Sequence, residues 1–292
     1  MTSTLIVGGL TVDRFIDGSV APGGSVLHSG LAAVEAGSEL TILTVAGDEP
    51  AAAKGLARLA AIGTLVRQAA PATTTYRHEE RGGVRVLIFE ARTDPIRADG
   101  LHGLRRPDVA LVAPIADEVP ASLVARLRDG LAPPRTVLLV QGWLRRLVEG
   151  EEVTATPLDA LTGDQRHALG AADAVVVSTE DLIESPGDPF GQAAELRRHA
   201  GQRPLILATL GAQGYLIDDP TVERVEASVP RRVITGVPAV GAGDTFGAAL
   251  AVHLARGVGK RVAADRATDA VIAMLESRQR NRSVPEHRPQ PA

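Results

Sequence analysis

Short apolar segments that alternate with amphipathic segments constrain the fold of this chain more than any other feature. Six of them are rich in β-branched residues, and most are apolar throughout: 4–9, 40–46, 108–114, 136–142, 174–178 and 204–211. Strands that are covered on both faces have this continuous pattern. Helical patterns lie between them, at 25–37, 50–63, 120–131, 190–201 and 265–278. The alternation predicts an α/β fold with a doubly wound, mainly parallel sheet and helices on both faces.

The first helical segment carries its own start and stop residues. Ser25 is expected to cap its amino end, and Gly37 is expected to end it. The apolar face of this helix is predicted to comprise Val26, Leu27, Leu31 and Val34.

Two segments interrupt the alternation. Residues 14–24 are short and rich in turn residues, and residues 73–92 resemble a hairpin with Gly82 and Gly83 at its turn. Because hairpins do not belong inside a doubly wound sheet, we expect a small β lid formed by about 12–22 and 73–95. The lid would project from one domain over residues 1–280. The polar segment 281–292 is predicted to be a disordered tail.

Composition excludes several kinds of site. The chain has no cysteine, which excludes disulfides, thiolate metal sites and a cysteine nucleophile. Its net charge of −4 does not favour a nucleic-acid partner. No apolar run is long enough to span a membrane, and the first residues lack the pattern of a signal peptide. We therefore expect a cytoplasmic protein without a membrane partner.

The segment VGAGDTFG, residues 240–247, opens a helical pattern that ends at Gly257. A glycine-rich turn at a helix start presents free backbone N–H groups, which bind anions. A dinucleotide fingerprint is disfavoured, since its glycine spacing is one residue shorter and no strand with a terminal acid follows. A phosphate-binding P-loop is excluded because it needs a lysine, and the chain has only Lys54 and Lys260.

A third interpretation is an anion hole with its own base. The N–H groups of Gly241, Ala242 and Gly243 would stabilise a phosphoryl group during transfer, and Asp244 would accept the proton of the attacking hydroxyl. Alternatively, Asp244 is only an N-cap of the helix.

Three motifs resemble those of the ribokinase-like (PfkB) carbohydrate kinase family. GAGDTFGAAL, from Gly241, resembles its carboxyl-terminal signature, residues 23–49 resemble its amino-terminal signature, and TLGAQG, residues 209–214, is similar to its nucleotide-binding TxGxxG stretch. Their order and spacing fit from about residue 6 to residue 275. The resemblance implies a ribokinase-like fold and an ATP-dependent kinase, with Asp244 as catalytic base and the turn as anion hole.

The resemblance also implies roles for residues elsewhere. Asp13 would bind substrate hydroxyls, and Gly23 and Gly24 would let the backbone approach the substrate. The nucleotide would be contacted by Thr209, Gly211 and Gly214, and by Ser178 and Asp181, which stand where the family has Asn-x-x-Glu. Mg²⁺ would be carried mainly by ATP phosphates and water, with no metal ligand assigned in the protein. The lid would close over the substrate and exclude water.

Two departures from the family pattern leave questions open. Pro238, Ala239 and Val240 replace the usual Asp-Thr-Thr, which helps to form a monovalent-cation site in the family, so dependence on such a cation is left open. His28 replaces the substrate-binding asparagine and is either a substrate contact or a structural hydrogen-bonding group.

A weaker resemblance, to the inositol-kinase-like branch, rests on residues 17–24, 73–96 and 140–146. In it Gln141 would contact substrate or phosphate, and Arg145 would bind a phosphate unless it is a solvated helix arginine. We predict a kinase for a sugar or cyclitol hydroxyl. The alternatives are a nucleoside kinase and a non-catalytic binding homologue. A homodimer through the exposed lid edge is a further expectation.

Overall fold

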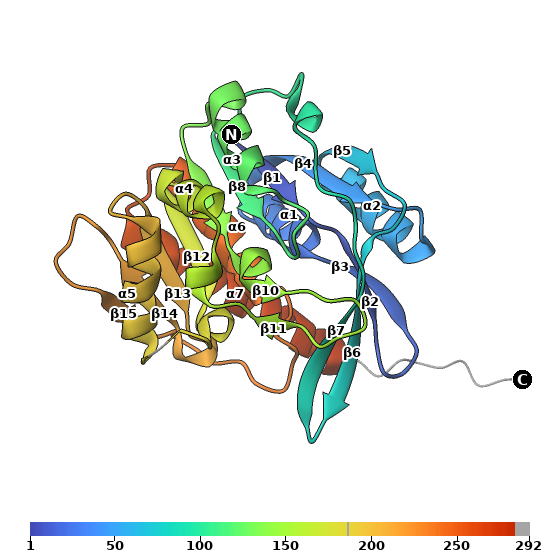
Figure 1. Ribbon diagram of the computed structural model, residues 1–292. Helices are drawn as coiled ribbons and strands as arrows, with labels where there is room; N and C mark the ends of the chain where they lie inside the picture. Colours follow the sequence, from blue (N-terminus) through green and yellow to red (C-terminus); the bar gives the residue numbers. More distant parts are fainter. Residues whose placement is uncertain (186, 284–292) are drawn as a thin grey trace, which may run out of the picture.

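The main body is built on one large sheet (Figure 1). The computed structural model describes residues 1–185 and 187–283, and in these residues nine strands form the sheet in the order β15-β14-β13-β12-β9-β8-β1-β4-β5. The seven strands from β13 to β5 are parallel, and β14 and β15 are antiparallel additions at one edge. The strands are β1 (Thr2–Gly8), β4 (Ser38–Ala46), β5 (Thr64–Ala69), β8 (Val109–Ala113), β9 (Thr136–Leu139), β12 (Ala174–Ser178), β13 (Leu205–Thr209), β14 (Tyr215–Asp218) and β15 (Glu226–Ser228).

Helices cover both faces of the sheet, as predicted. One face packs against α1 (Ser25–Glu35), α2 (Pro50–Ile62), α6 (Ala242–Ala255) and α7 (Lys260–Ser283). The other packs against α3 (Ala121–Leu131), α4 (Gly163–Ala171) and α5 (Pro189–Ala200). Alternate residues of a strand point to opposite faces, so Ile6 of β1 enters the first core while Leu5 and Val7 enter the second. This double burial explains the continuously apolar strand sequences.

A second, four-stranded sheet has the order β3-β2-β6-β7. Its strands are β2 (Thr11–Arg14), β3 (Val20–Gly23), β6 (Thr74–Arg81) and β7 (Val84–Ala91), and Figure 1 shows the β6–β7 hairpin projecting from the main body. The segment 148–153 covers the outer edge of β7, where Phe89 N–H donates to the Glu151 carbonyl at 3.0 Å. Strands β10 (Arg145–Arg146) and β11 (Thr154–Ala155) flank this segment. The edge of β3 is left uncovered by strands of this sheet.

Some expectations about the first helix are wrong. Gly24 is the N-cap of α1, and the Ser25 hydroxyl instead donates to the carbonyl of Ala113. Val26 and Leu27 are buried, as predicted, but Leu31 and Val34 are 44% and 38% exposed. The other buried residues of the helix are small: Ser25, Ser29, Gly30, Ala32 and Ala33. The helix ends at Glu35, in agreement with the predicted stop at Gly37, whose φ is 77°.

Other elements were not expected from the sequence. Strand β5 is an edge strand with polar residues, and β14 and β15 are only four and three residues long, so none has a continuous apolar pattern. Helix α7 extends to Ser283, so residues 281–283 are helical, and the rest of the predicted tail, 284–292, lies outside the described residues. Five 3₁₀ turns complete the fold: η1 (Ala98–Leu101), η2 (Gln141–Leu144), η3 (Leu158–Ala160), η4 (Thr179–Leu182) and η5 (Gly211–Gln213).

Helix α6 is buried along almost all of its length, which fixes the position of the turn that precedes it. It packs closely on β9, since a Cβ at Gly247 would overlap the side chain of Leu139. Parallel strands end at one edge of the sheet, and ligands of open α/β folds bind there. The amino end of α6 lies at this edge, beside the ends of β9, β12 and β13. Within the described residues no helix has the length and hydropathy needed to span a membrane.

Candidate active site

A cavity of about 430 Å³ lies at the carboxyl edge of the main sheet and extends to the small sheet. Of the residues proposed for the site from sequence, all except Gly23 and Gly214 line it. Those are Asp13, Gly24, His28, Gln141, Arg145, Ser178, Asp181, Thr209, Gly211, Gly241, Ala242, Gly243 and Asp244. The fold thus brings together residues that are up to 231 positions apart (Asp13 to Asp244, 244 − 13).

The backbone geometry of the glycine-rich turn favours glycine at its first position, residue 241. Gly241 is the N-cap of α6 with φ 78°, a conformation that favours glycine. A Cβ at Gly241 would also overlap the imidazole of His28 from α1. His28 therefore packs directly on the glycine-rich turn, which a side chain at residue 241 would prevent.

Asp244 stands in the first turn of α6 and makes no capping hydrogen bond, so the interpretation as an N-cap is wrong. Its side chain faces the cavity, and burial raises the pKa of its carboxyl. The charge of Arg145 acts against this rise in pKa, whereas the charge of Asp181 adds to it. The backbone of Asp244 is tied to α1, because the Ser29 hydroxyl donates to its carbonyl at 3.3 Å.

Arg145 and Asp181 lie on the side of the cavity formed by η2 and η4. The Asp181 carboxylate accepts long hydrogen bonds of 3.3 and 3.4 Å from Nε2 of Gln141. Burial raises the pKa of Asp181, and the charge of Arg145 opposes this rise. Arg145 begins β10 and is half-buried in the cavity wall, so it is not the solvated helix arginine that was the alternative.

Asp13 is supplied by β2 of the small sheet. Its carboxylate accepts a hydrogen bond from the Thr11 hydroxyl at 3.2 Å, and Nε2 of His78 lies 3.7 Å away. Gly23 of β3 pairs with Thr11, and a Cβ at Gly23 would overlap the carboxyl of Asp13. Gly23 therefore makes room for this acid and does not itself line the cavity.

The remaining predicted positions support the backbone near the cavity. The hydroxyl of Ser178 accepts from the N–H of Glu180 and caps η4, and the hydroxyl of Thr209 donates to the carbonyl of Val177 at 3.4 Å. Gly214 is outside the cavity wall. Its φ of 102° and its close contact with the backbone of Ser228 show a structural role in the β14–β15 hairpin.

Two residues near the site were missed at the sequence level. Tyr76 on β6 is buried and lines the cavity, and its hydroxyl donates to the carbonyl of Ile115 at 3.0 Å. Glu118 is buried and accepts from the N–H groups of Ile115 and Ala116 at 3.0 and 2.8 Å. A buried tyrosine in the hairpin could have been noticed from its alternation with polar residues, but no pattern marks Glu118.

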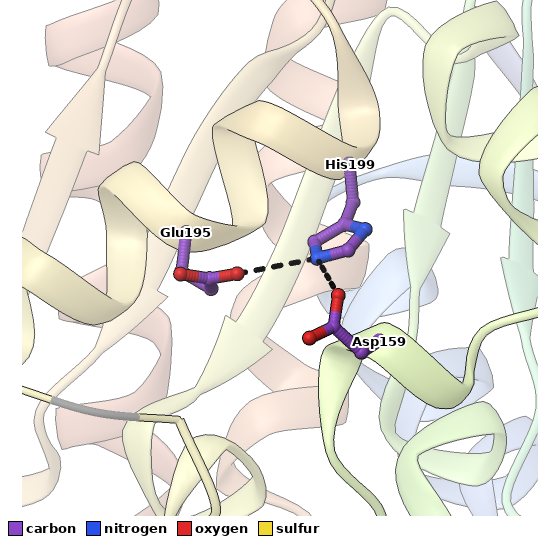
Figure 2. A group of neighbouring side chains, drawn as sticks. All are labelled: Asp159, Glu195 and His199. Atoms are coloured by element: carbon purple, nitrogen blue, oxygen red, sulfur yellow. Dashed lines mark hydrogen bonds and ion pairs between the residues drawn. The ribbon is translucent and has the colours of Figure 1, made fainter.

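A second cluster of polar side chains lies outside the cavity. Figure 2 shows His199 Nε2 between two carboxylates, 3.3 Å from Glu195 and 3.5 Å from Asp159. Arg198 pairs with Glu195, and Arg166 donates to the backbone carbonyl of Asp159 at 2.7 Å. Because Arg198 already pairs with Glu195 and the carboxylate of Asp159 is 89% exposed, we treat the cluster as a network of surface ion pairs.

Comparisons with known proteins were made for sequence and for structure. No family model matches the sequence, and no curated protein matches it. Solved structures of ribokinase-family kinases superpose over nearly the whole chain. A pyrophosphate-dependent myo-inositol-1 kinase, in a variant converted to a myo-inositol-3 kinase, has 19% identity, a TM-score of 0.76 and coverage of 93% of both chains. Ribokinase from Thermotoga maritima has 16% identity, a TM-score of 0.70 and coverage of 94% of this chain and 93% of its own.

This chain has the ribokinase-like fold. The fold predicted from the three sequence motifs is thereby confirmed, including the small β lid beside the main sheet. A fructokinase from Vibrio cholerae with the same fold was solved with fructose, ADP and a potassium ion. It has 17% identity, a TM-score of 0.70 and coverage of 92% of this chain and 90% of its own.

Proposed function

We propose that this protein is a kinase that phosphorylates a hydroxyl group of a sugar or cyclitol. One observation carries the proposal. The carboxyl of Asp244 faces the cavity at the start of α6, has a raised pKa, and is adjacent to a glycine-rich turn at a helix amino end. A base and an anion-binding turn in one cavity are what phosphoryl transfer to an alcohol requires.

In the proposed reaction the acceptor hydroxyl lies between Asp13 and Asp244. Asp13 accepts a hydrogen bond from a neighbouring hydroxyl and so orients the ring. As the acceptor oxygen forms its bond to the terminal phosphorus, the bond from that phosphorus to the bridging oxygen breaks, and the hydroxyl proton passes to Asp244. The N–H groups of Gly241, Ala242 and Gly243 stabilise the negative charge of the phosphoryl group in transfer.

ATP with Mg²⁺ is the proposed donor. The long hydrogen bonds from Gln141 to Asp181 leave this carboxylate able to bind a hydrated Mg²⁺ ion, so the donor side of the cavity fits the metal. Mg²⁺ would neutralise phosphate charge. Arg145 would bind a phosphate oxygen, and Thr209 and Gly211 would contact the rest of the donor.

Inorganic pyrophosphate is the second candidate donor. Two solved structures similar to this chain are pyrophosphate-dependent kinases, one of them complexed with a pyrophosphate analogue and myo-inositol. Among the described residues, none from 212 to 238 lines the cavity. Pyrophosphate, which has no nucleoside, would occupy only the part of the cavity beside Arg145 and the glycine-rich turn.

A panel of acceptors and donors tests the proposal. Release of ADP or of phosphorylated product is measured for inositols, pentoses, hexoses and nucleosides, each with ATP and with pyrophosphate. Turnover of an inositol or a sugar is the expected result. A preference for nucleosides would show that the protein is a nucleoside kinase and not a sugar or cyclitol kinase. Ligand-dependent thermal shifts without turnover would favour the non-catalytic binding homologue.

A further inference from the structure

The segment that leads into the glycine-rich turn is held by a side chain of α7. Nη1 of Arg278 donates to the carbonyl of Pro238 at 2.8 Å and to the carbonyl of Val240 at 2.7 Å. Val240 immediately precedes Gly241, the N-cap of α6. Two backbone carbonyls therefore converge on one cationic nitrogen next to the turn. Arg278 does not line the cavity itself.

Convergent backbone carbonyls are also the ligands that proteins use for alkali cations. Here, however, the positive charge between them belongs to the chain. A monovalent ion between the same two oxygens would have to displace the guanidinium of Arg278. The residues present consequently do not fit a bound monovalent cation at this position.

The guanidinium is fixed by its surroundings. Arg278 is half-buried, and although burial lowers the pKa of its guanidinium, arginine keeps its proton in proteins. A second contact ties α7 to the same irregular segment, since Arg232 pairs with Glu276 at 2.7 Å. Arg231 also pairs with Asp269 at 2.8 Å, so α7 holds the segment at several points, one of them directly before the turn.

We propose that Arg278 is a positioning residue whose guanidinium takes the place of a monovalent cation at the carbonyls of Pro238 and Val240. It holds these carbonyls so that the N–H groups of the following turn point into the cavity, and it makes the protein independent of potassium. The effect on turnover rests on the proposed kinase function, whereas the effect of cations on stability does not.

The test compares Arg278→Ala with wild type and with Arg280→Ala, an exposed arginine of the same helix. Turnover is measured in potassium, sodium and choline chloride at constant ionic strength, with and without millimolar guanidinium. Wild type and Arg280→Ala should not respond to the cation. Arg278→Ala should lose about 10- to 100-fold in kcat, as expected for charge-assisted hydrogen bonds, and potassium or guanidinium should restore much of the loss.

The melting temperature, measured by thermal unfolding in the same salts, tests the proposal without any substrate. Potassium should raise the melting temperature of Arg278→Ala above its value in choline chloride, without a matching rise in wild type. Arg278→Lys is the second variant. Its ammonium group should reach the same carbonyls, preserve folding and give no response to potassium.

Three results would each overturn the proposal. The first is a wild-type protein that potassium activates or stabilises as strongly as Arg278→Ala. The second is an Arg278→Ala protein with no cation-specific response in either measurement. The third is an Arg278→Lys protein that responds to potassium as strongly as Arg278→Ala. If no acceptor is turned over but the melting temperatures behave as expected, the kinase assignment fails while the role of Arg278 stands.

Discussion

At the scale of single residues, Gly241 lets the glycine-rich turn pack against His28 of α1. Its φ of 78° costs a residue with a side chain about 1–2 kcal/mol, and the added Cβ would overlap His28. Gly243 of the same turn has no atom within 4 Å of its Cβ position. We predict that Gly241→Ala lowers the melting temperature by several degrees and that Gly243→Ala does not. Equal melting temperatures for the two variants would contradict the packing of His28 on the turn.

Asp244 is the residue on which the proposed chemistry depends. Asp244→Asn removes the base but keeps the shape of the side chain, so kcat should fall by about 10²- to 10⁴-fold with little change in the affinity for the donor. The control is Asp164→Asn, which removes an aspartate from the first turn of α4, away from the cavity. Steady-state kinetics give kcat and the KM for the donor in both variants. Turnover of Asp244→Asn at the level of Asp164→Asn would exclude the mechanism.

The pH dependence follows from the burial of Asp244. Its pKa is raised above the ordinary value of 3.8, and only the deprotonated carboxylate can accept a proton. As the pH falls through this raised pKa the base is lost, so the acid limb of kcat should lie at higher pH than an exposed aspartate would give. A pH–rate profile measures this limb. The residual activity of Asp244→Asn should lack the limb, and an unchanged limb in that variant would assign it to another group.

At the scale of elements, one backbone carbonyl in the loop after β8 accepts hydrogen bonds from both the small sheet and β10. Ile115, which follows β8, accepts from the Tyr76 hydroxyl and, at 3.2 Å, from Arg145. Burial raises the pKa of Tyr76 to about 12, so its hydroxyl stays protonated and donates throughout the neutral range. The cavity wall thus combines β6, the loop after β8 and the start of β10 through shared hydrogen bonds.

We predict that Tyr76→Phe lowers the free energy of unfolding by only about 1 kcal/mol, since Arg145 still donates to the carbonyl of Ile115. The KM for the acceptor should rise, because the small sheet carries Asp13. Tyr215→Phe is the matched control, since its hydroxyl donates at 2.6 Å to Asp265, outside the cavity. Denaturant unfolding and acceptor titrations separate the two effects. An unchanged KM in Tyr76→Phe would show that this contact does not position the small sheet.

At the scale of the whole molecule, the small sheet offers one open edge. The edge of β7 is covered by residues 148–153, whereas β3 is the terminal strand on the other side. Apolar side chains are exposed in the turn between β2 and β3, Phe15 at 38% and Ile16 at 69%, and at the start of β3, Val20 at 48%. An uncovered edge beside exposed apolar residues favours contact with a second copy.

Sedimentation equilibrium tests this proposed homodimer. We expect a dimer for wild type and a monomer for Val20→Lys, because the substitution places a charge on the edge strand. Val222→Lys changes a valine of similar exposure, 49%, outside the small sheet and should leave the dimer intact. A wild-type protein that sediments as a monomer would exclude the homodimer.

The sequence by itself determined the layered architecture. Strands buried on both faces must be apolar at every position, so β1, β8 and β12 were recognisable without a structure, as was the glycine-rich start of α6. The short antiparallel strands β14 and β15 were not, because edge strands need neither length nor a continuous apolar pattern. The face of α1 was predicted only in part, because small residues of the helix are buried and Leu31 and Val34 are exposed.

Only the tertiary structure decided how the residues of the site act on one another. The raised pKa of Asp244 comes from burial among groups that are distant in sequence, and no local pattern encodes it. Packing alone places His28 on Gly241, and Tyr76 at the loop after β8. The pairing of Arg278 with the carbonyls of Pro238 and Val240 joins residues about 40 positions apart. Local sequence encodes burial and backbone conformation, whereas electrostatic environment depends on neighbours that only the folded chain brings together.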